Sequence, residues 1–70
     1  MASKPSISRQ AILDAAYRQA QREGIASLSI RGIAADCGVA IGSIYNHFPD
    51  KASLVTEVIG CFWEQAARGE

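Results

Sequence analysis

Residues suited to catalysis or metal binding are scarce in this chain. Its 70 residues include one histidine, two cysteines and no glycine-rich phosphate loop. The spacing of Cys37 and His47 matches no metal-binding pattern. The carboxylates are scattered and form no arrangement of acid, base and nucleophile. The sequence therefore argues against an enzyme, and we expect no metal and no other cofactor.

Long apolar segments are also absent. No run approaches the roughly 18 residues that cross a membrane, and the segment from Met1 to Pro5 lacks the apolar core of a secretory signal. We therefore expect a cytoplasmic protein with no membrane partner. Two cysteines in such a chain favour free thiols, and the apolar surroundings of Cys37 and Cys61 predict that both are buried. A disulfide or a metal pair is the alternative.

An excess of charge of either sign is missing as well. Seven basic and seven acidic residues give a formal net charge of zero, whereas domains that bind nucleic acids are usually basic. The charges are unevenly placed, however. Residues 37–49 hold no formally charged side chain apart from a protonated His47, and Arg31 and Lys51 flank that stretch. A locally non-acidic surface can bind phosphate through neutral donors with modest electrostatic help.

What is present is enough apolar sequence for one small domain. Hydrophobic residues make up 49% of the chain, which suits a single core and argues against disorder. We expect a flexible tail over residues 1–7, then a first helix over residues 9–23 with Ser8 as its N-cap and Gly24 at its end. Apolar residues at helical spacing give this helix one side that faces the core, and polar residues such as Gln19 are expected in solvent.

The central stretch predicts two short helices joined by a tight turn. Ser29 can cap a helix over residues 30–37, Gly38 can take the positive φ of a sharp turn, and a second helix follows over residues 40–48. This order is that of a helix-turn-helix over about residues 29–48. Apolar side chains on one side of the second helix leave small and hydrogen-bonding groups on the other, as reading a DNA major groove requires. A helical hairpin packed only for stability is the alternative.

A fourth helix is expected over residues 51–68, with Asp50 as its N-cap. Its first half can cover a three-helix core, but Phe62, Trp63 and Ala66 lie beyond the reach of so small a core. Excess apolar surface of this kind usually marks an interface. A small helical protein-interaction module that uses Phe62 and Trp63 is therefore the main alternative to a DNA-binding function.

Several short motifs lie at a familiar spacing in this chain. They are Ile12-Leu13-Asp14-Ala15-Ala16, Gly24, Ile33-Ala34, Gly38-Val39 and, above all, Gly42-Ser43-Ile44-Tyr45-Asn46-His47-Phe48 with Lys51 and Leu54. Through them, residues 8 to 66 resemble the N-terminal domain of the TetR (tetracycline-repressor-like) family of transcriptional regulators. The resemblance implies an all-α fold: a three-helix, homeodomain-like bundle with a helix-turn-helix, plus the start of a long fourth helix.

The resemblance also implies a function. Residues 8–68 would form a domain that binds double-stranded, palindromic operator DNA, as half of a homodimeric repressor. In this family a larger C-terminal domain dimerises and binds a small-molecule effector, and we expect that domain to be absent from this chain.

Roles for individual residues follow from the same resemblance. Ser29 and Arg31 correspond to positions that touch phosphate or a base edge. The first turn of the reading helix, which enters the major groove, comprises Ala40, Ile41, Gly42 and Ser43. Tyr45 and His47 correspond to aromatic residues that contact phosphate, Asn46 to a variable position that can reach bases, and Lys51 to a lysine that grips phosphate. The structural alternatives are a half-buried core residue for Tyr45, a packing residue for His47, and a solvated charge for Arg31 or Lys51.

The sequence departs from the family pattern at several positions. Ala40 stands where a capping serine is frequent, Ala20 where a phenylalanine often fills the core, and Ile41 where many members carry a polar group. Gly32 replaces a residue that is often acidic, which is expected to weaken the second helix by up to about 1 kcal/mol relative to alanine. These differences affect capping, packing and sequence preference but leave the predicted DNA-binding function intact.

Overall fold

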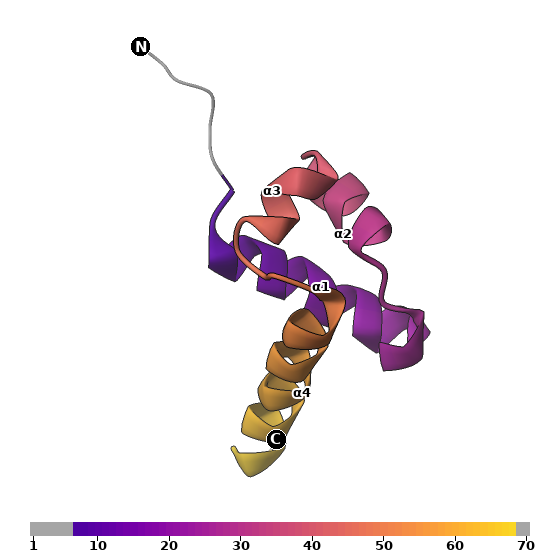
Figure 1. Cartoon of the computed structure of the whole chain (residues 1–70). Coiled ribbons are helices and arrows are strands. Elements are labelled where there is room, and N and C mark those ends of the chain that lie inside the picture. The colour runs from indigo at the N-terminus through magenta and orange to yellow at the C-terminus, as the bar shows by residue number, and fades with distance from the viewer. Residues whose placement is uncertain (1–6, 69–70) are drawn as a thin grey trace.

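The computed structural model describes residues 7–68, and this part of the chain folds into four α-helices and one short 3-10 helix. The elements are α1 (Arg9–Glu23), η1 (Ile25–Ser27), α2 (Ile30–Cys37), α3 (Ile41–Tyr45) and α4 (Lys51–Ala67). In Figure 1, α2 and α3 lie above α1, and α4 runs away below it. The residues described contain no β-strand, so the expected all-α fold is confirmed. The predicted tail over residues 1–7 lies outside the described residues except for Ile7.

Side-chain caps fix where α1 and α4 begin. The Ser8 Oγ atom accepts a hydrogen bond from the Ala11 amide at 3.0 Å, and Oδ1 of Asp50 accepts one from the Ser53 amide at 2.8 Å. Such bonds satisfy amide groups that have no partner inside the helix, and each typically stabilises it by about 1 kcal/mol. The starts predicted for these two helices are therefore confirmed.

The connector between α1 and α2 turns at Gly24. Its φ of 93° is a backbone angle that residues with a side chain rarely adopt. The Gly24 amide donates to the Ala20 carbonyl oxygen at 2.8 Å and closes the last turn of α1. The chain then forms η1 and leads to Leu28, which is buried, while Ile25 is half-buried against the core. Both apolar residues therefore anchor the connector to the core.

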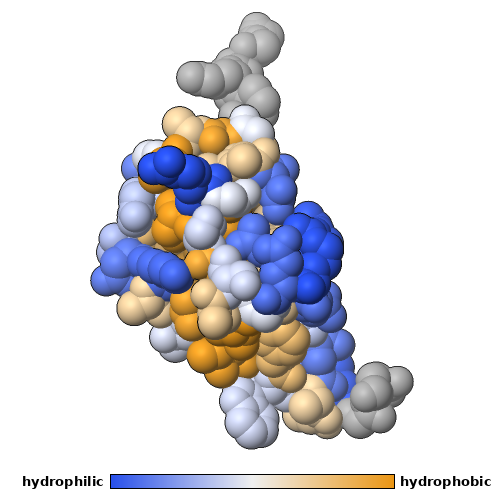
Figure 2. Space-filling model, turned by 90° about the vertical axis from the view of Figure 1, so that its right-hand side faces the viewer, coloured by the Kyte–Doolittle hydropathy of each residue, from blue (hydrophilic) through white to orange (hydrophobic). Residues whose placement is uncertain are grey.

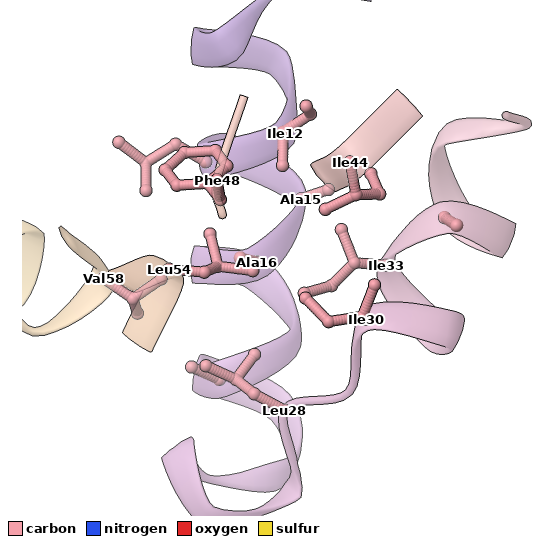
Figure 3. Close-up of a cluster of buried hydrophobic side chains, with 13 residues drawn as sticks. Ile12, Ala15, Ala16, Leu28, Ile30, Ile33, Ile44, Phe48, Leu54 and Val58 are labelled. Carbon is pink, nitrogen blue, oxygen red and sulfur yellow. The ribbon is translucent and has the colours of Figure 1, made fainter. Parts of the chain in front are cut away.

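The core is built around α1 (Figure 3). In this view, Leu54 and Val58 of α4 lie on one side of α1, and Ile33 of α2 and Ile44 of α3 lie on the other. Burying a large apolar side chain contributes about 1.5–3 kcal/mol, so these contacts hold the helices together. The buried apolar side chains are Ile12, Leu13, Ala15, Ala16, Ala20, Leu28, Ile30, Ile33, Ala34, Ile44, Phe48, Leu54 and Val58.

Gln19 is buried rather than solvated, so its predicted placement was wrong. It is only 7% exposed. Its position three residues after Ala16 and four after Ala15 puts it on the core-facing side of α1. Burying an amide is costly unless its polar atoms are bonded, and here Oε1 of Gln19 accepts a hydrogen bond from the Ser29 amide at 3.2 Å. Gln19 thus links α1 to the start of α2.

The apolar end of α4 is only partly free. Phe62 packs against Tyr17 of α1, with ring centroids 4.6 Å apart and planes tilted by 43°, and is half-buried. The prediction that Phe62 lies beyond the core was wrong, because the large ring of Tyr17 extends the core along α4. Trp63 is 72% exposed and Ala66 is also exposed, as predicted.

Candidate nucleic-acid interface

The turn between α2 and α3 is fixed by Gly38. Its φ of 72° and ψ of 32° lie in the left-handed region, which glycine adopts at no steric cost. The Gly38 amide donates to the Ala35 carbonyl oxygen at 3.2 Å, and the Val39 amide donates to that of Ala34 at 3.0 Å. These two bonds form a Schellman motif, which satisfies carbonyl groups at the end of α2. The predicted helix-turn-helix is present, and Gly38 sets the direction in which α3 leaves α2.

α3 (Ile41–Tyr45) is shorter than the helix predicted over residues 40–48. After its last residue, the His47 amide donates to the Ile44 carbonyl oxygen at 3.0 Å, a tighter bond of the 3-10 type. Pro49 then disfavours helical backbone in the residue before it. The regular helix therefore ends before the predicted boundary, although the chain continues in a turn.

The two sides of α3 differ as predicted. Ile44 is fully buried and anchors the helix in the core, whereas Ile41 is 37% exposed and Tyr45 is 47% exposed. We call the outward side the α3 surface. It consists of the exposed residues Ala40, Ile41, Gly42, Tyr45 and Asn46 and the half-buried residues Ser43 and His47. This surface offers amide, hydroxyl and aromatic groups and no carboxylate, a combination suited to base edges and phosphates.

No side chain caps the start of α3. Ala40 has extended backbone angles, with φ of −75° and ψ of 157°, and its side chain makes no hydrogen bond to the helix. Its carbonyl oxygen accepts a bond from the Ser43 amide at 3.0 Å. The expected loss of a capping hydroxyl is confirmed. Because such a cap typically contributes about 1 kcal/mol, α3 depends on packing for its stability.

Ser29 holds the start of α2. Its Oγ atom accepts a hydrogen bond from the Gly32 amide at 2.8 Å. This cap occupies one lone pair of the hydroxyl and leaves its hydrogen for another acceptor. Ser29 is half-buried, and its predicted contact with DNA stays a prediction.

The positive charges nearest to α3 in the sequence are not neutralised. Arg31 in the first turn of α2 and Lys51 at the start of α4 are both exposed. Neither forms an ion pair with any residue between 7 and 68. By contrast, Arg22 lies 3.9 Å from Asp36, between Nη2 and Oδ2. The two cations that flank the stretch without formal charge are therefore free of ion pairs within residues 7–68.

His47 makes a contact that sequence reasoning missed. Its Nε2 atom lies 3.0 Å from the carbonyl oxygen of Ile7, forty residues earlier in the chain. The bond is partly buried, and it joins the residue before the α1 cap to the turn after α3. No local pattern could reveal it, because the two residues share neither a helix nor a motif.

Arg9 was also missed as a structural residue. Its guanidinium carbon lies 4.7 Å from the centroid of the Phe48 ring, and its Nη2 atom lies 2.9 Å from Oε2 of Glu57. A guanidinium over an aromatic face is attracted by the ring quadrupole, by about 0.5–1 kcal/mol at a partly exposed site. Arg9 thus connects three parts of the fold: the start of α1, the segment after α3, and α4.

Cys37 and Cys61 are free thiols, but both are half-buried rather than fully buried as predicted. α2 and α4 are amphipathic helices on the outside of a small core, so residues at the edge of their apolar side stay partly in contact with water. Burial raises the pKa of the Cys37 thiol; Asp36 raises it further, and Arg18 opposes the shift. Burial also raises the pKa of Cys61, helped by Glu64, Glu57 and Asp14. Thiols of raised pKa are poor nucleophiles at neutral pH.

The part of the chain that the structure describes shows neither a metal site nor a membrane-crossing helix. Within residues 7–68, no three histidine, cysteine or acidic side chains are grouped closely enough to hold a metal ion. No helix there has the length and apolar character needed to cross a membrane. The surface nevertheless holds apolar residues between hydrophilic ones, as the face in Figure 2 shows.

Known proteins resemble this chain over most of its length. The family described as "Bacterial regulatory proteins, tetR family" matches residues 12–58. The HTH-type transcriptional regulator AcrR of Shigella flexneri is 44% identical over 57 residues, which are 81% of this chain and 25% of that protein. The HTH-type transcriptional regulator SAUSA300_2515 of Staphylococcus aureus (strain USA300) is 36% identical over 52 residues, 74% of this chain and 28% of that protein.

The matched region of these relatives is only part of them. The chain spans about a quarter of the length of the curated relatives that it matches. No solved structure matches it. The family match covers α2, α3 and the turn between them, together with most of α1 and the first half of α4.

Proposed function

This chain belongs to the TetR family of bacterial regulatory proteins, and from that premise we propose that it binds operator DNA through the α3 surface as part of a ligand-responsive repressor. The expected family and its helix-turn-helix DNA-binding domain are confirmed by the match. The family is one of transcription regulators rather than enzymes. The operator, the mode of assembly and the sense of regulation belong to the proposal.

One observation carries the proposal. The α3 surface is exposed, has no carboxylate, and lies in the sequence between two cations that have no ion-pair partner within residues 7–68, Arg31 and Lys51. A helix fixed by one buried side chain, Ile44, can present its other side to a major groove about 12 Å wide. The flanking cations can then bind phosphates on the groove edges.

We assign the contacts from the family resemblance and, for Asn46, from the chemistry of its side chain. The first turn of α3, from Ala40 to Ser43, enters the groove, where the small side chains permit close approach. The amide of Asn46 is the best candidate for reading a base, because it can bond adenine through two hydrogen bonds. Contacts to the sugar-phosphate backbone are assigned to Ser29, Arg31, Tyr45 and Lys51, and His47 lies on the same surface.

Assembly and control are proposed from the relatives. One α3 reads one half-site, so a palindromic operator needs two copies held about one helical turn of DNA apart, roughly 34–36 Å. The relatives are about four times as long as the matched region. We propose that a region equivalent to the unmatched part of these relatives forms the homodimer and binds a small-molecule effector. We also propose that the protein acts in the cytoplasm, where bacterial DNA lies.

The salt dependence of DNA binding tests the proposal. Replacing a lysine that binds phosphate should weaken binding to all sequences alike and reduce the slope of log K against log salt by about one. We expect this result for Lys51→Ala on random-sequence duplex DNA. Arg68→Ala is the matched control, because Arg68 is also exposed and cationic but follows the far end of α4.

The outcomes separate the proposal from its alternative. Equal slopes for Lys51→Ala and wild type would remove Lys51 from the interface. Binding that does not depend on salt would argue against a DNA-binding function as a whole. It would favour a protein-interaction module, for which Trp63 is the exposed candidate and Phe62 is already packed on Tyr17.

A further inference from the structure

We propose that His47 is a positioning residue: its Nε2–H group holds the backbone of Ile7 and so fixes the segment after α3 against the start of α1. This role differs from the phosphate contact that the family resemblance implies for His47. The inference rests on the proposed function, because the position of α3 matters through its fit to DNA. It also makes a claim about the free protein that can be tested without DNA.

The chemistry of the bond assigns the hydrogen. The Nε2 atom of His47 and the Ile7 carbonyl oxygen are 3.0 Å apart, and a carbonyl oxygen can only accept. Nε2 therefore carries the hydrogen, and in a neutral ring Nδ1 is left as an acceptor. A phosphate oxygen is an acceptor too. Neutral His47 thus has no hydrogen left to donate to DNA.

The short length of α3 explains why such a bond matters. An isolated helix of five residues is far too short to be stable in water, and no side chain caps its start. Ile44 anchors the middle of the helix in the core. The direction of its far end is set by what holds the residues that follow, and the first contact of that kind is the one from His47 to Ile7.

A second contact supports the same segment independently. Phe48 is buried, and the guanidinium of Arg9 lies over its ring at 4.7 Å from the centroid. Arg9 is held in turn by Glu57 of α4, with Nη2 and Oε2 2.9 Å apart. Two consecutive residues after α3 are therefore held by residues on either side of the α1 cap. This arrangement fits a role for His47 in fixing the position of α3 better than a role in binding phosphate.

The first experiment determines the tautomer of His47 in the wild-type chain without DNA. Long-range proton–nitrogen correlation spectra distinguish Nε2–H from Nδ1–H. They are recorded at pH about 8, because an ordinary imidazole has a pKa of ~6.5 and is neutral there. We expect Nε2–H, together with a carbonyl carbon shift of Ile7 typical of a hydrogen-bonded group. A neutral ring protonated at Nδ1 would overturn the inference.

The second experiment uses two substitutions that each keep one side of the ring. A glutamine amide can reach the place of Nε2, so His47→Gln should keep the bond to Ile7; an asparagine amide takes the place of Nδ1, so His47→Asn should lose it. We expect His47→Gln to bind random-sequence duplex DNA within about twofold of wild type. His47→Asn should bind about fivefold more weakly, the equivalent of one ordinary hydrogen bond.

The reverse order of affinities would overturn the inference and assign His47 a phosphate contact through Nδ1. The Ile7 carbonyl shift should change in His47→Asn and stay in His47→Gln, and a shift that changes in neither would also overturn it. If His47→Asn fails to fold, the tautomer of the wild-type ring and the DNA affinity of His47→Gln still test the inference. A wild-type chain that shows Nε2–H but binds no DNA would reject the proposed function while leaving the bond to Ile7 established.

Discussion

Substituting Gly32 with alanine should destabilise the fold, although the same change usually stabilises a helix. An alanine inside a helix gains up to about 1 kcal/mol over glycine. At Gly32, however, a Cβ atom would lie 3.0 Å from Nε2 of Gln19 and 3.0 Å from Oγ of Ser29. Both neighbours are held in place, since Gln19 is buried and bonded to the Ser29 amide and Oγ of Ser29 caps α2.

The magnitude follows from what the new methyl group displaces. Making room for the methyl group shifts the Gln19 amide by a few tenths of an ångström and stretches its bond to the Ser29 amide, which is already 3.2 Å long. Loss of that bond would leave buried polar groups unsatisfied, at a cost of about 1–3 kcal/mol. Subtracting the intrinsic gain of about 1 kcal/mol leaves a net loss of roughly 1 kcal/mol. For a domain of this size, that loss lowers the melting temperature by about 4–8 °C.

Thermal unfolding followed by circular dichroism measures the effect. Gly60→Ala is the matched control, because Gly60 lies inside α4 and a Cβ there would meet nothing within 4 Å; this change should raise the melting temperature. In a Gln19→Ala background, Gly32→Ala should lose most of its cost, since the obstructing amide is gone. If Gly32→Ala stabilises the wild-type chain as much as Gly60→Ala does, the reasoning about Gln19 is refuted.

Three further predictions concern the surface. Gly42→Ala also adds a Cβ in open space, so it should raise the melting temperature but lower affinity for DNA; normal binding would show that α3 does not dock closely there. Cys37 and Cys61 should react with iodoacetamide more slowly than glutathione at pH about 8, because burial raises the pKa of both thiols; equal rates would contradict this. Trp63 should be quenched readily by acrylamide, and the chain should sediment as a monomer at low micromolar concentration; a stable dimer with a protected Trp63 would reverse both expectations.

Local signals explain why most of the fold could be predicted from sequence. Ser8, Ser29 and Asp50 each precede a helix and cap it, and Gly24 and Gly38 each end one. These are short-range effects of backbone chemistry, so they can be read without knowing the fold. Prediction failed where a distant residue decides the outcome, because Tyr17 draws Phe62 into the core. The end of the reading helix was misplaced for a local reason, the turn that follows Tyr45.

The candidate site was predictable in outline but not in its supporting contacts. The burial of Ile44 and Phe48, four residues apart, and the exposure of Tyr45, next to Ile44, follow from helical spacing. The bond from His47 to Ile7 spans forty residues, and nothing in either local sequence indicates it. Nor did the sequence indicate that Gly32 lies next to the Gln19 amide, whose Nε2 atom is 3.0 Å from where a Cβ would be.

A net charge of zero is compatible with DNA binding because the charges are distributed unequally. Arg9 and Arg22 are offset by Glu57 and Asp36, while the cations beside the helix-turn-helix stay free of ion pairs within residues 7–68. If those two cations, Arg31 and Lys51, bind two phosphates, the salt slope of one domain is about −1.8, and affinity falls about twelvefold between 50 and 200 mM salt. Two domains on one operator double the slope to about −3.6 and the loss to about 150-fold. We therefore expect a single domain to bind weakly, and the proposed pairing of two domains to raise the affinity and double the salt slope.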